Sequence, residues 1–340
     1  MILPEPTKRA MIDVGRKCNM NCNFCYYKHL GDLRLESFTP SIDLECEINS
    51  AHKRGCNYID FTGGEPTIYP EITRLIKHAL SKDIKSCVIT NAICGDKTVQ
   101  KILDSGVDDF LISLHGHSEE MHDKLTNKEG ARRRQERFMN YLKGNFKNQF
   151  RFNAVIAKYN QNYLPELARY MVKWNPKIVN FINMNPHGDW SKDRQGTREV
   201  IADLRVAEVG LNEAINILED HGIGVNVRYY PMCRINKYYR RTVCNDLHVM
   251  FDPYEWDYKE MPKTYEQYKS WGVRTSKNIE YQGMPCCDCD IKHICGGINT
   301  ALTLATSNKM IDKQSELEMK DCSFYHYRAN NKLTLRSRDG

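Results

Sequence analysis

The chain has 340 residues, of which 41% are hydrophobic, and it carries a formal net charge of +6 at pH 7. No apolar run reaches about 18 residues, the length that indicates a membrane span, so no membrane association is expected. The first residues lack the features of a secretory signal. Fourteen cysteines without such a signal predict a cytoplasmic protein with metal or redox chemistry in place of disulfides.

The chain up to about residue 225 alternates between β-rich runs and stretches of helical periodicity. Apolar residues such as Ile72, Leu75 and Ile76 follow the 3.6-residue spacing of a helix packed on a core. This alternation predicts an α/β domain with a parallel sheet and helices outside it. The six predicted strands are Arg9–Val14, Asn57–Thr62, Ser86–Asn91, Asp109–His115, Phe150–Ile156 and Ile178–Met184.

Three cysteines, Cys18, Cys22 and Cys25, follow the first predicted strand. Their C-x3-C-x2-C spacing lets three thiolates hold three irons of a [4Fe–4S] cube and leaves the fourth iron without a protein ligand. An open position of this kind distinguishes a catalytic metal from a structural one. The alternative is a zinc knuckle, for which His29 is the local candidate fourth ligand.

A second motif follows the second predicted strand. Gly63 and Gly64 let the backbone approach a ligand closely, and Glu65 and Pro66 complete a Gly-Gly-Glu-Pro sequence. The Glu65 carboxylate suits an ammonium partner. A zinc knuckle at the cysteines would leave this motif unexplained.

Together the two motifs resemble those of the radical S-adenosylmethionine (SAM) superfamily. The resemblance implies a partial (β/α)6 TIM-like barrel in which SAM binds the open iron and is cleaved by one electron to a 5′-deoxyadenosyl radical. It also implies that Gly63, Gly64, Glu65 and Pro66 meet the SAM amino group and that Phe24 lies near the adenine. A one-electron donor such as flavodoxin or ferredoxin is the implied protein partner. Both motifs follow strands, so both are expected on the rim formed by the C-terminal strand ends.

Polar residues within the predicted strands or at their ends are further candidates. Strands buried on both faces are normally continuous apolar runs, so polar residues inside them need a reason. By the resemblance, Ser113 and Asn153 would contact the ribose or carboxylate of SAM. Asn91 is another cofactor-binding candidate and His115 is a catalytic candidate. The alternative is that these side chains only satisfy nearby backbone groups.

Charged residues offer two further interpretations. Asp60 is expected to line the lumen or to pair with a buried arginine such as Arg151. The run Arg132–Arg134 is interpreted as a solvated face because no aromatic residues are interleaved with it, so no nucleic-acid partner is expected.

After about residue 225 the alternation is expected to stop, and cysteines become frequent. The run that starts at Cys286 contains C-x2-C-x5-C-G-G, which resembles the core of the SPASM and twitch extensions of radical SAM enzymes. These extensions carry auxiliary [4Fe–4S] clusters. The ligand set implied for one cluster is Cys286, Cys289, Cys295 and Cys322.

Two further cysteines leave alternatives open. Cys233 and Cys244 are candidate metal ligands, and in the twitch arrangement they would join Cys286 and Cys289. A structural zinc site is the other alternative for this region. Cys233 is also a candidate catalytic hydrogen donor, which would indicate epimerisation.

The sequence thus predicts a radical SAM core over residues 1–225 and an auxiliary-cluster domain over residues 226–340. The expected reaction is hydrogen abstraction from a small polar substrate (a sugar, nucleotide or amino-acid derivative), leading to oxidation, bond formation or epimerisation. A small substrate is favoured because the first barrel strand begins near residue 9, without a preceding leader-peptide module. Peptide modification with a separate leader-binding partner is the main alternative. A non-catalytic iron–sulfur electron carrier is the other, although it would not need the Gly-Gly-Glu-Pro motif.

Overall fold

The structure, a computed structural model, describes residues 9–25, 37–184, 199–244, 280–281, 289, 295 and 297–299. The strands are β1 (Arg9–Asp13), β2 (Tyr58–Thr62), β3 (Lys85–Thr90), β4 (Asp109–Ser113), β5 (Arg151–Ile156), β6 (Ile178–Asn183), β7 (Gly224–Arg228), β8 (Val243–Cys244), β9 (Glu280–Tyr281) and β10 (Ile298–Asn299). The α-helices are α1 (Ser41–Lys53), α2 (Ile72–Leu80), α3 (Asp96–Asp104), α4 (Glu119–Thr126), α5 (Ala131–Asn145), α6 (Leu164–Val172) and α8 (Leu204–Asp220). The 3-10 helices in the described residues are η2 (Pro66–Ile68), η4 (Met232–Arg234) and η5 (Lys237–Thr242).

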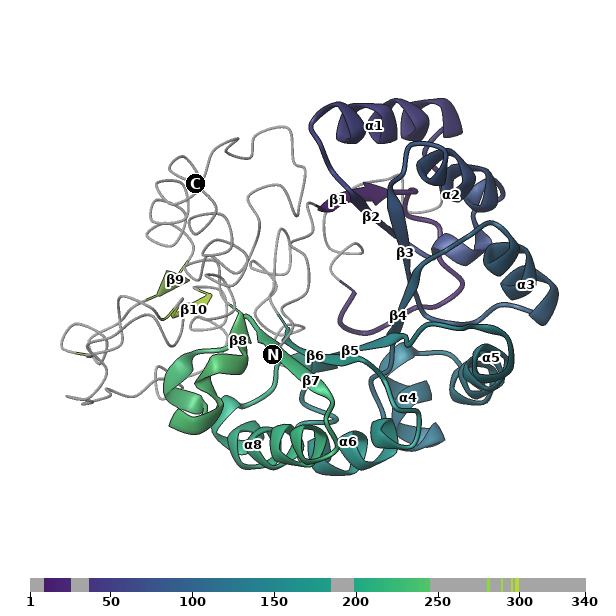
Figure 1. The fold of residues 1–340 in the computed structure, drawn as a ribbon. Helices are drawn as coiled ribbons and strands as arrows, with labels where there is room; N and C mark the ends of the chain where they lie inside the picture. Colours follow the sequence, from purple (N-terminus) through teal and green to yellow (C-terminus); the bar gives the residue numbers. More distant parts are fainter. Residues whose placement is uncertain are drawn as a thin grey trace.

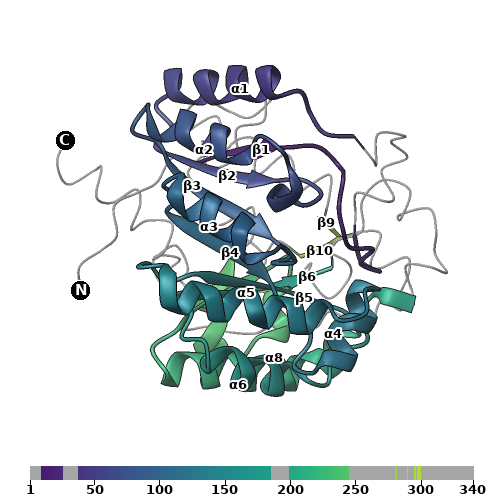
Figure 2. The same ribbon diagram turned by 90° about the vertical axis from the view of Figure 1, so that its right-hand side faces the viewer.

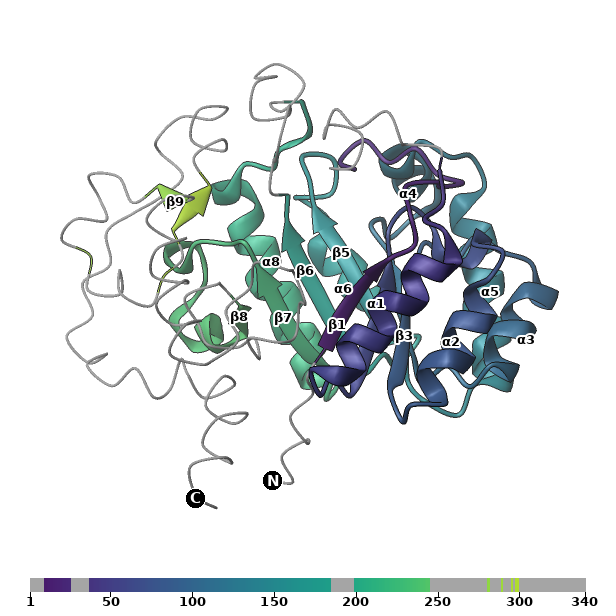
Figure 3. The same ribbon diagram turned by 90° about the horizontal axis from the view of Figure 1, so that it is seen from above.

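Strands β1 to β8 form one parallel sheet in the order of the sequence, and each strand is hydrogen-bonded to the next. The sheet curls, and the helices lie along its outer side (Figure 1). Figure 2 shows α2, α3 and α5 covering this outer side, and Figure 3 shows the curl from above. The predicted α/β fold with a partial barrel is therefore confirmed.

All six predicted strands are present, and each end lies within two residues of the predicted one. The sheet continues past residue 225, where we expected the alternation to stop, although the described residues contain no α-helix after α8. Helix α8 is followed by β7, which spans that position, and β8 extends the sheet to Cys244. Strand β7 has five residues, of which only Val225 and Val227 are fully buried and face the helices. The alternate positions include the polar residues Asn226 and Arg228. The proposed domain boundary lies inside β7, and the division into two domains stays a prediction.

The two faces of the sheet differ in chemistry. On β4, Phe110 and Ile112 are fully buried against the helices, and the Phe110 ring meets Phe138 of α5 edge-on at 5.5 Å. Burying each such side chain contributes about 1.5–3 kcal/mol. The alternate positions, including Asp109 and Ser113, face the lumen. The core therefore lies between sheet and helices, and the polar strand residues are turned to the inside of the curl.

Among the helices in the described part of the chain, none has the length and hydropathy needed to cross a bilayer.

Candidate active site

The loop that carries the three N-terminal cysteines follows β1 and is held at two places. On one side, the Asn19 side chain donates to the Ile93 carbonyl (2.8 Å), just beyond β3. On the other, the backbone amides of Asn21 and Asn23 donate to the carbonyls of Thr126 (3.2 Å) and Leu125 (3.0 Å) at the end of α4. The Asn23 side chain adds a bond to the Lys124 carbonyl (2.9 Å). The asparagines between the cysteines thus fix this loop at the C-terminal ends of the strands, as predicted for the rim.

The sulfur of Cys18 accepts two N–H groups, from the Met20 backbone (3.4 Å) and from the Asn91 side chain (3.7 Å). Cys22 and Cys25 are half-buried. Cys18 is exposed when the whole residue is considered, but other protein atoms surround its thiol. The protein atoms packed around the Cys18 thiol disfavour the thiolate and, with the negative charge of Glu65, raise its pKa to about 11. Binding of a metal would therefore displace a proton from this thiol.

No group of three or more His, Cys, Asp or Glu residues in the described ranges converges on one metal-ion position. A multi-iron cluster does not require such convergence, because each thiolate bonds its own iron.

The Gly-Gly-Glu-Pro loop lies directly against the segment that precedes Cys18. The amide of Gly64 donates to the Gly15 carbonyl (2.7 Å), and the amide of Glu65 donates to the Lys17 carbonyl (2.9 Å). Gly63 has a φ of +125°, and a Cβ on Gly64 would overlap the carbonyl oxygen of Lys17. Glycine is therefore required at both positions for the two loops to meet.

The Glu65 carboxylate has a different set of partners from the one that we expected. It is buried, its Oε1 accepts bonds from the Thr67 amide (2.9 Å), the Thr67 hydroxyl (2.7 Å) and the Thr90 hydroxyl (2.6 Å), and its Oε2 accepts the Asn91 amide (2.7 Å). Burial raises the pKa of Glu65, and these four bonds oppose that rise. These bonds join the Gly-Gly-Glu-Pro loop to the end of β3. The expected contact between the Glu65 carboxylate and a cofactor ammonium stays a prediction.

Two histidines lie next to the cysteine loop. The Phe24 ring meets the His115 ring edge-on (4.7 Å, 73°), and His115 stacks on His122 of α4 (5.9 Å, 6°). The Val155 amide donates to Nδ1 of His115 (3.1 Å), and the His115 amide donates to Nδ1 of His122 (3.3 Å). Both rings therefore carry their proton on Nε2. Burial lowers the pKa of His115 to about 3 and holds that of His122 well below its usual range, so both are neutral at ordinary pH.

A row of polar side chains crosses the lumen above the middle of the sheet. Ser113, Asn153, Asn180 and Asn226 are consecutive register partners on β4, β5, β6 and β7. The Asn226 side chain donates to Asn180 Oδ1 (2.8 Å), and Asn153 Oδ1 is buried without a hydrogen-bond partner in the described residues. Sequence analysis found Ser113 and Asn153 and missed the other two. The same signal, a polar residue at an inward strand position, would have found Asn180.

Deeper in the lumen, buried arginine and aspartate side chains form ion pairs around Asp60. Arg9 lies 2.8 Å from the Asp60 carboxylate, and Arg151 lies 3.9 Å from it and 2.6 Å from Asp109. The Tyr58 hydroxyl also donates to Asp109 (3.2 Å). One of our two interpretations, that Asp60 pairs with a buried arginine such as Arg151, is therefore confirmed. Arg9 lies closer to the Asp60 carboxylate than Arg151 does.

The sequence profile of the radical SAM superfamily matches residues 12–171. Residues 12–171 therefore form a radical SAM domain. The chain is similar to the "Probable GTP 3′,8-cyclase" of Methanococcus aeolicus, with 32% identity over 123 residues, which cover 35% of this chain and 41% of that protein. The chain thus spans about two fifths of the length of this curated relative.

The solved structures that share the fold of this chain include the following two. One is Streptococcus suis SuiB bound to S-adenosylmethionine, with 16% identity, a TM-score of 0.60, and coverage of 91% of this chain and 76% of that one. The other is anSMEcpe with bound AdoMet and the Cp18Cys peptide, with 14% identity, a TM-score of 0.59, and coverage of 99% and 98%. At these identities the likeness is one of fold.

The cysteines that follow the radical SAM domain are described in part. Cys295 is buried, and its sulfur accepts the backbone amides of Met232 and Gly297, both at 3.4 Å. Cys289 is also buried. Cys233 lies in η4 next to Met232, half-buried against the core, and Cys244 lies on β8. The structure thus places Cys295 against the neighbour of Cys233, while Cys286 and Cys322 lie outside the described residues.

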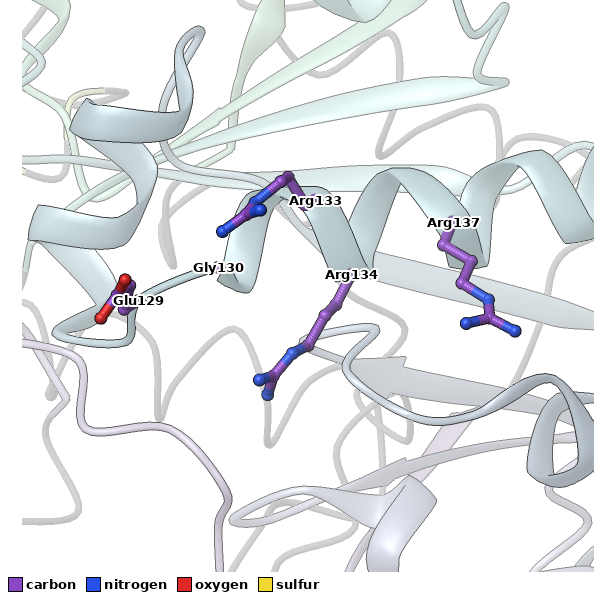
Figure 4. Close-up of a pocket in the computed structure, with 5 residues that line it drawn as sticks. All are labelled: Glu129, Gly130, Arg133, Arg134 and Arg137. Carbon is purple, nitrogen blue, oxygen red and sulfur yellow. The ribbon is translucent and has the colours of Figure 1, made fainter.

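A surface hollow of about 470 Å³ lies at the start of α5, and it is lined by Glu129, Gly130, Arg133, Arg134 and Arg137 (Figure 4). Arg133 pairs with Glu119 (2.7 Å) on the exposed surface. The prediction of a solvated face was wrong for Arg132, which is buried and whose guanidinium lies over the Tyr170 ring at 3.8 Å. The hollow contains none of the candidate site residues of the radical SAM domain.

Proposed function

We propose that this chain reductively cleaves SAM and uses the resulting 5′-deoxyadenosyl radical to abstract a hydrogen atom from a small polar substrate. The observation that carries the proposal is the joining of two motifs. The segment that leads into Cys18 and the loop with Gly63 and Gly64 come from different strands and meet backbone to backbone on the rim.

The residues present fit a [4Fe–4S] cluster bound by this loop. Cys18 already accepts N–H bonds, which are the contacts that thiolate ligands of such clusters receive. The loop is anchored through its asparagines, so the three thiols are held in place before a cluster binds. When bound, the cluster would supply the electron for SAM cleavage at its open iron.

The residues around the loop also suit a nucleoside. We assign the backbone of Gly63 and Gly64, and not the Glu65 side chain, to the SAM amino group, because that carboxylate already has four donors. Phe24 offers an aromatic face to the adenine. Asn153 Oδ1, a buried acceptor without a partner in the described residues, suits a ribose hydroxyl. Ser113 lies beside it in register and would join that contact.

For the substrate we propose a sugar, nucleotide or amino-acid derivative. A nucleotide is supported by the likeness to a probable GTP 3′,8-cyclase over the radical SAM domain. The amides of Asn180 and Asn226 on the lumen face provide hydrogen-bonding groups for an uncharged polar ligand. The outcome would be oxidation, bond formation or epimerisation, with flavodoxin or ferredoxin as the electron donor.

A second candidate is peptide modification. It is supported by a likeness to the "PqqA peptide cyclase" of Bradyrhizobium diazoefficiens, with 20% identity over 196 residues. The solved structure of SuiB with its precursor peptide also shares the fold, with a TM-score of 0.55. Under this reading a separate partner would present the peptide.

We also propose an auxiliary [4Fe–4S] cluster in the C-terminal part, with Cys286, Cys289, Cys295 and Cys322 as ligands. The support is the environment of Cys295, whose buried sulfur accepts two backbone amides. Such N–H bonds stabilise a thiolate ligand. Cys233 and Cys244 remain alternative ligands.

Formation of 5′-deoxyadenosine tests the proposed function. Anaerobically reconstituted protein with dithionite and SAM should form it, and the triple variant Cys18→Ala, Cys22→Ala, Cys25→Ala should not. Cys46→Ala, which removes an exposed cysteine on α1, is the matched control and should keep the activity. Iron binding without 5′-deoxyadenosine would favour an electron carrier and defeat the proposal.

A further inference from the structure

The Asn91 side chain is fixed at three points just beyond β3. Its Nδ2 donates to Asn19 Oδ1 (2.7 Å) and to Cys18 Sγ (3.7 Å), and its Oδ1 accepts the Ile93 amide (2.9 Å). Exchanging the amide oxygen and nitrogen would place an N–H against the Ile93 N–H and an oxygen against two acceptors. The orientation that points N–H at the sulfur is therefore the one that the surroundings require.

The backbone of Asn91 is held just as firmly. Its amide donates to the buried Glu65 carboxylate (2.7 Å), and its carbonyl accepts the Gln135 side chain (3.2 Å). The following residue, Ala92, has a φ of +60°, which sets the turn at the end of the strand. The backbone of Asn91 is thus positioned by elements that do not belong to the cysteine loop, and its side-chain N–H faces Cys18 in the absence of a cluster.

An N–H group that faces a cluster sulfur acts on the reduction potential. One-electron reduction adds negative charge that is shared by the cluster and its thiolate sulfurs, and an N–H donor stabilises the more negative form. Hydrogen bonds to the sulfurs are among the factors that set the potentials of iron–sulfur clusters. The side-chain amide of Asn91 can supply such a bond without carrying a charge of its own.

We propose that Asn91 is a positioning residue that donates a hydrogen bond to the Cys18 sulfur of the bound [4Fe–4S] cluster and thereby raises its reduction potential. This rests on the proposed function. It also changes the expected role of Asn91 from a contact with SAM to a contact with a cluster ligand. The electron comes from the flavodoxin or ferredoxin class of donor, and no bond to Asn91 forms or breaks when the cluster takes it up.

Asn23 provides a matched control on the same loop. Its side chain also ties the cysteine loop to the body of the protein, by a bond of 2.9 Å, but the acceptor is the Lys124 carbonyl. Asn23→Leu therefore removes an anchor without removing an N–H from Cys18. Asn91→Leu removes the donor, and Asn91→Asp keeps the size of the side chain and an oxygen for the Ile93 amide.

The test is a redox titration of the reconstituted protein, followed by the electron paramagnetic resonance signal of the reduced cluster. At the potential that half-reduces the wild-type cluster, the ratio of reduced to oxidised cluster in Asn91→Leu should be about tenfold lower. For a one-electron couple this corresponds to a midpoint potential about 59 mV more negative. Asn91→Asp should shift in the same direction by at least as much, and Asn23→Leu should match the wild type.

Each other outcome overturns the inference. An unchanged or higher midpoint in the Asn91 variants, with full iron content, would show that the N–H does not act on the cluster. Loss of the cluster in both Asn91 variants but not in Asn23→Leu would assign Asn91 to assembly alone. Absence of a reducible cluster in the wild type would instead defeat the proposed function, so the two failures are distinguishable.

Discussion

The Phe24 ring rests edge-on against the His115 ring at 4.7 Å, which joins the cysteine loop to the end of β4. His115 in turn stacks on His122, whose helix accepts two backbone bonds from the same loop. The cysteine loop is thus seated on two buried, neutral histidines. This has consequences for the stability of the protein in acid.

We predict that the cluster-free protein loses stability as the pH falls below about 6.5. The folded-state pKa of His115, about 3, lies below the ordinary value of 6.5, so the unfolded chain binds the additional proton between these values. His115 alone should lower the free energy of unfolding by about 2 kcal/mol between pH 7 and pH 5. Urea titrations at the two pH values should show a smaller loss for His115→Gln than for the wild type. His52→Gln, at an exposed position, should leave the loss unchanged.

Glu65→Gln should lower the free energy of unfolding of the cluster-free protein, in which no ligand is bound. Four donors now face the two oxygens of the Glu65 carboxylate. Glutamine replaces one of these oxygens by an NH2 group, so at least one buried donor loses its acceptor, at a cost of about 1–3 kcal/mol. Urea unfolding of the cluster-free variant measures this cost. Glu71→Gln, which weakens an exposed pair with Arg74 (3.1 Å), should cost less than about 1 kcal/mol. Wild-type stability together with weaker SAM binding would instead return the carboxylate to the SAM amino group.

Arg151→Met should lower the free energy of unfolding by about 3–5 kcal/mol, because it leaves the buried Asp109 and Asp60 carboxylates short of a partner. Arg137→Met breaks a pair of similar length with Asp96 (2.7 Å), but that arginine side chain is 72% exposed. Its cost should therefore be small, because water screens an exposed ion pair. Equal costs for the two variants would show that the lumen network is not sealed from water.

Cys233→Ala distinguishes the two roles expected of this residue. If Cys233 is a cluster ligand, the variant should lose or perturb auxiliary iron, as seen in the Mössbauer spectrum of protein that also lacks the first three cysteines. If it is the hydrogen donor, the variant should keep its iron and cleave SAM, and wild-type product should contain solvent deuterium, because a thiol exchanges its proton with water. Cys94→Ala, at another half-buried cysteine, is the control. Full iron content without deuterium in the product would contradict both roles.

The sequence was informative wherever the signal was local. The six strands and the placement of both motifs on the rim followed from periodicity. The pairing of Asp60 with a buried arginine was one of two interpretations drawn from the rarity of charge inside strands. The role of Glu65 did not follow from a local signal, because its donors on Thr90 and Asn91 lie on the next strand and reach it only through tertiary packing. Strand β7 was missed for a related reason. Its five residues include Asn226 and Arg228 on the lumen face, so it lacks the apolar run that marks a buried strand.

Binding of SAM to an open iron is the central claim, and electron–nuclear double resonance of the reduced protein tests it most directly. With SAM labelled with ¹⁵N at the amine and ¹⁷O at the carboxylate, the wild type should show hyperfine coupling of both nuclei to the cluster at Cys18, Cys22 and Cys25. The signal should vanish in the triple alanine variant and persist in Cys46→Ala. A reduced cluster that shows neither coupling while SAM is bound would contradict the account.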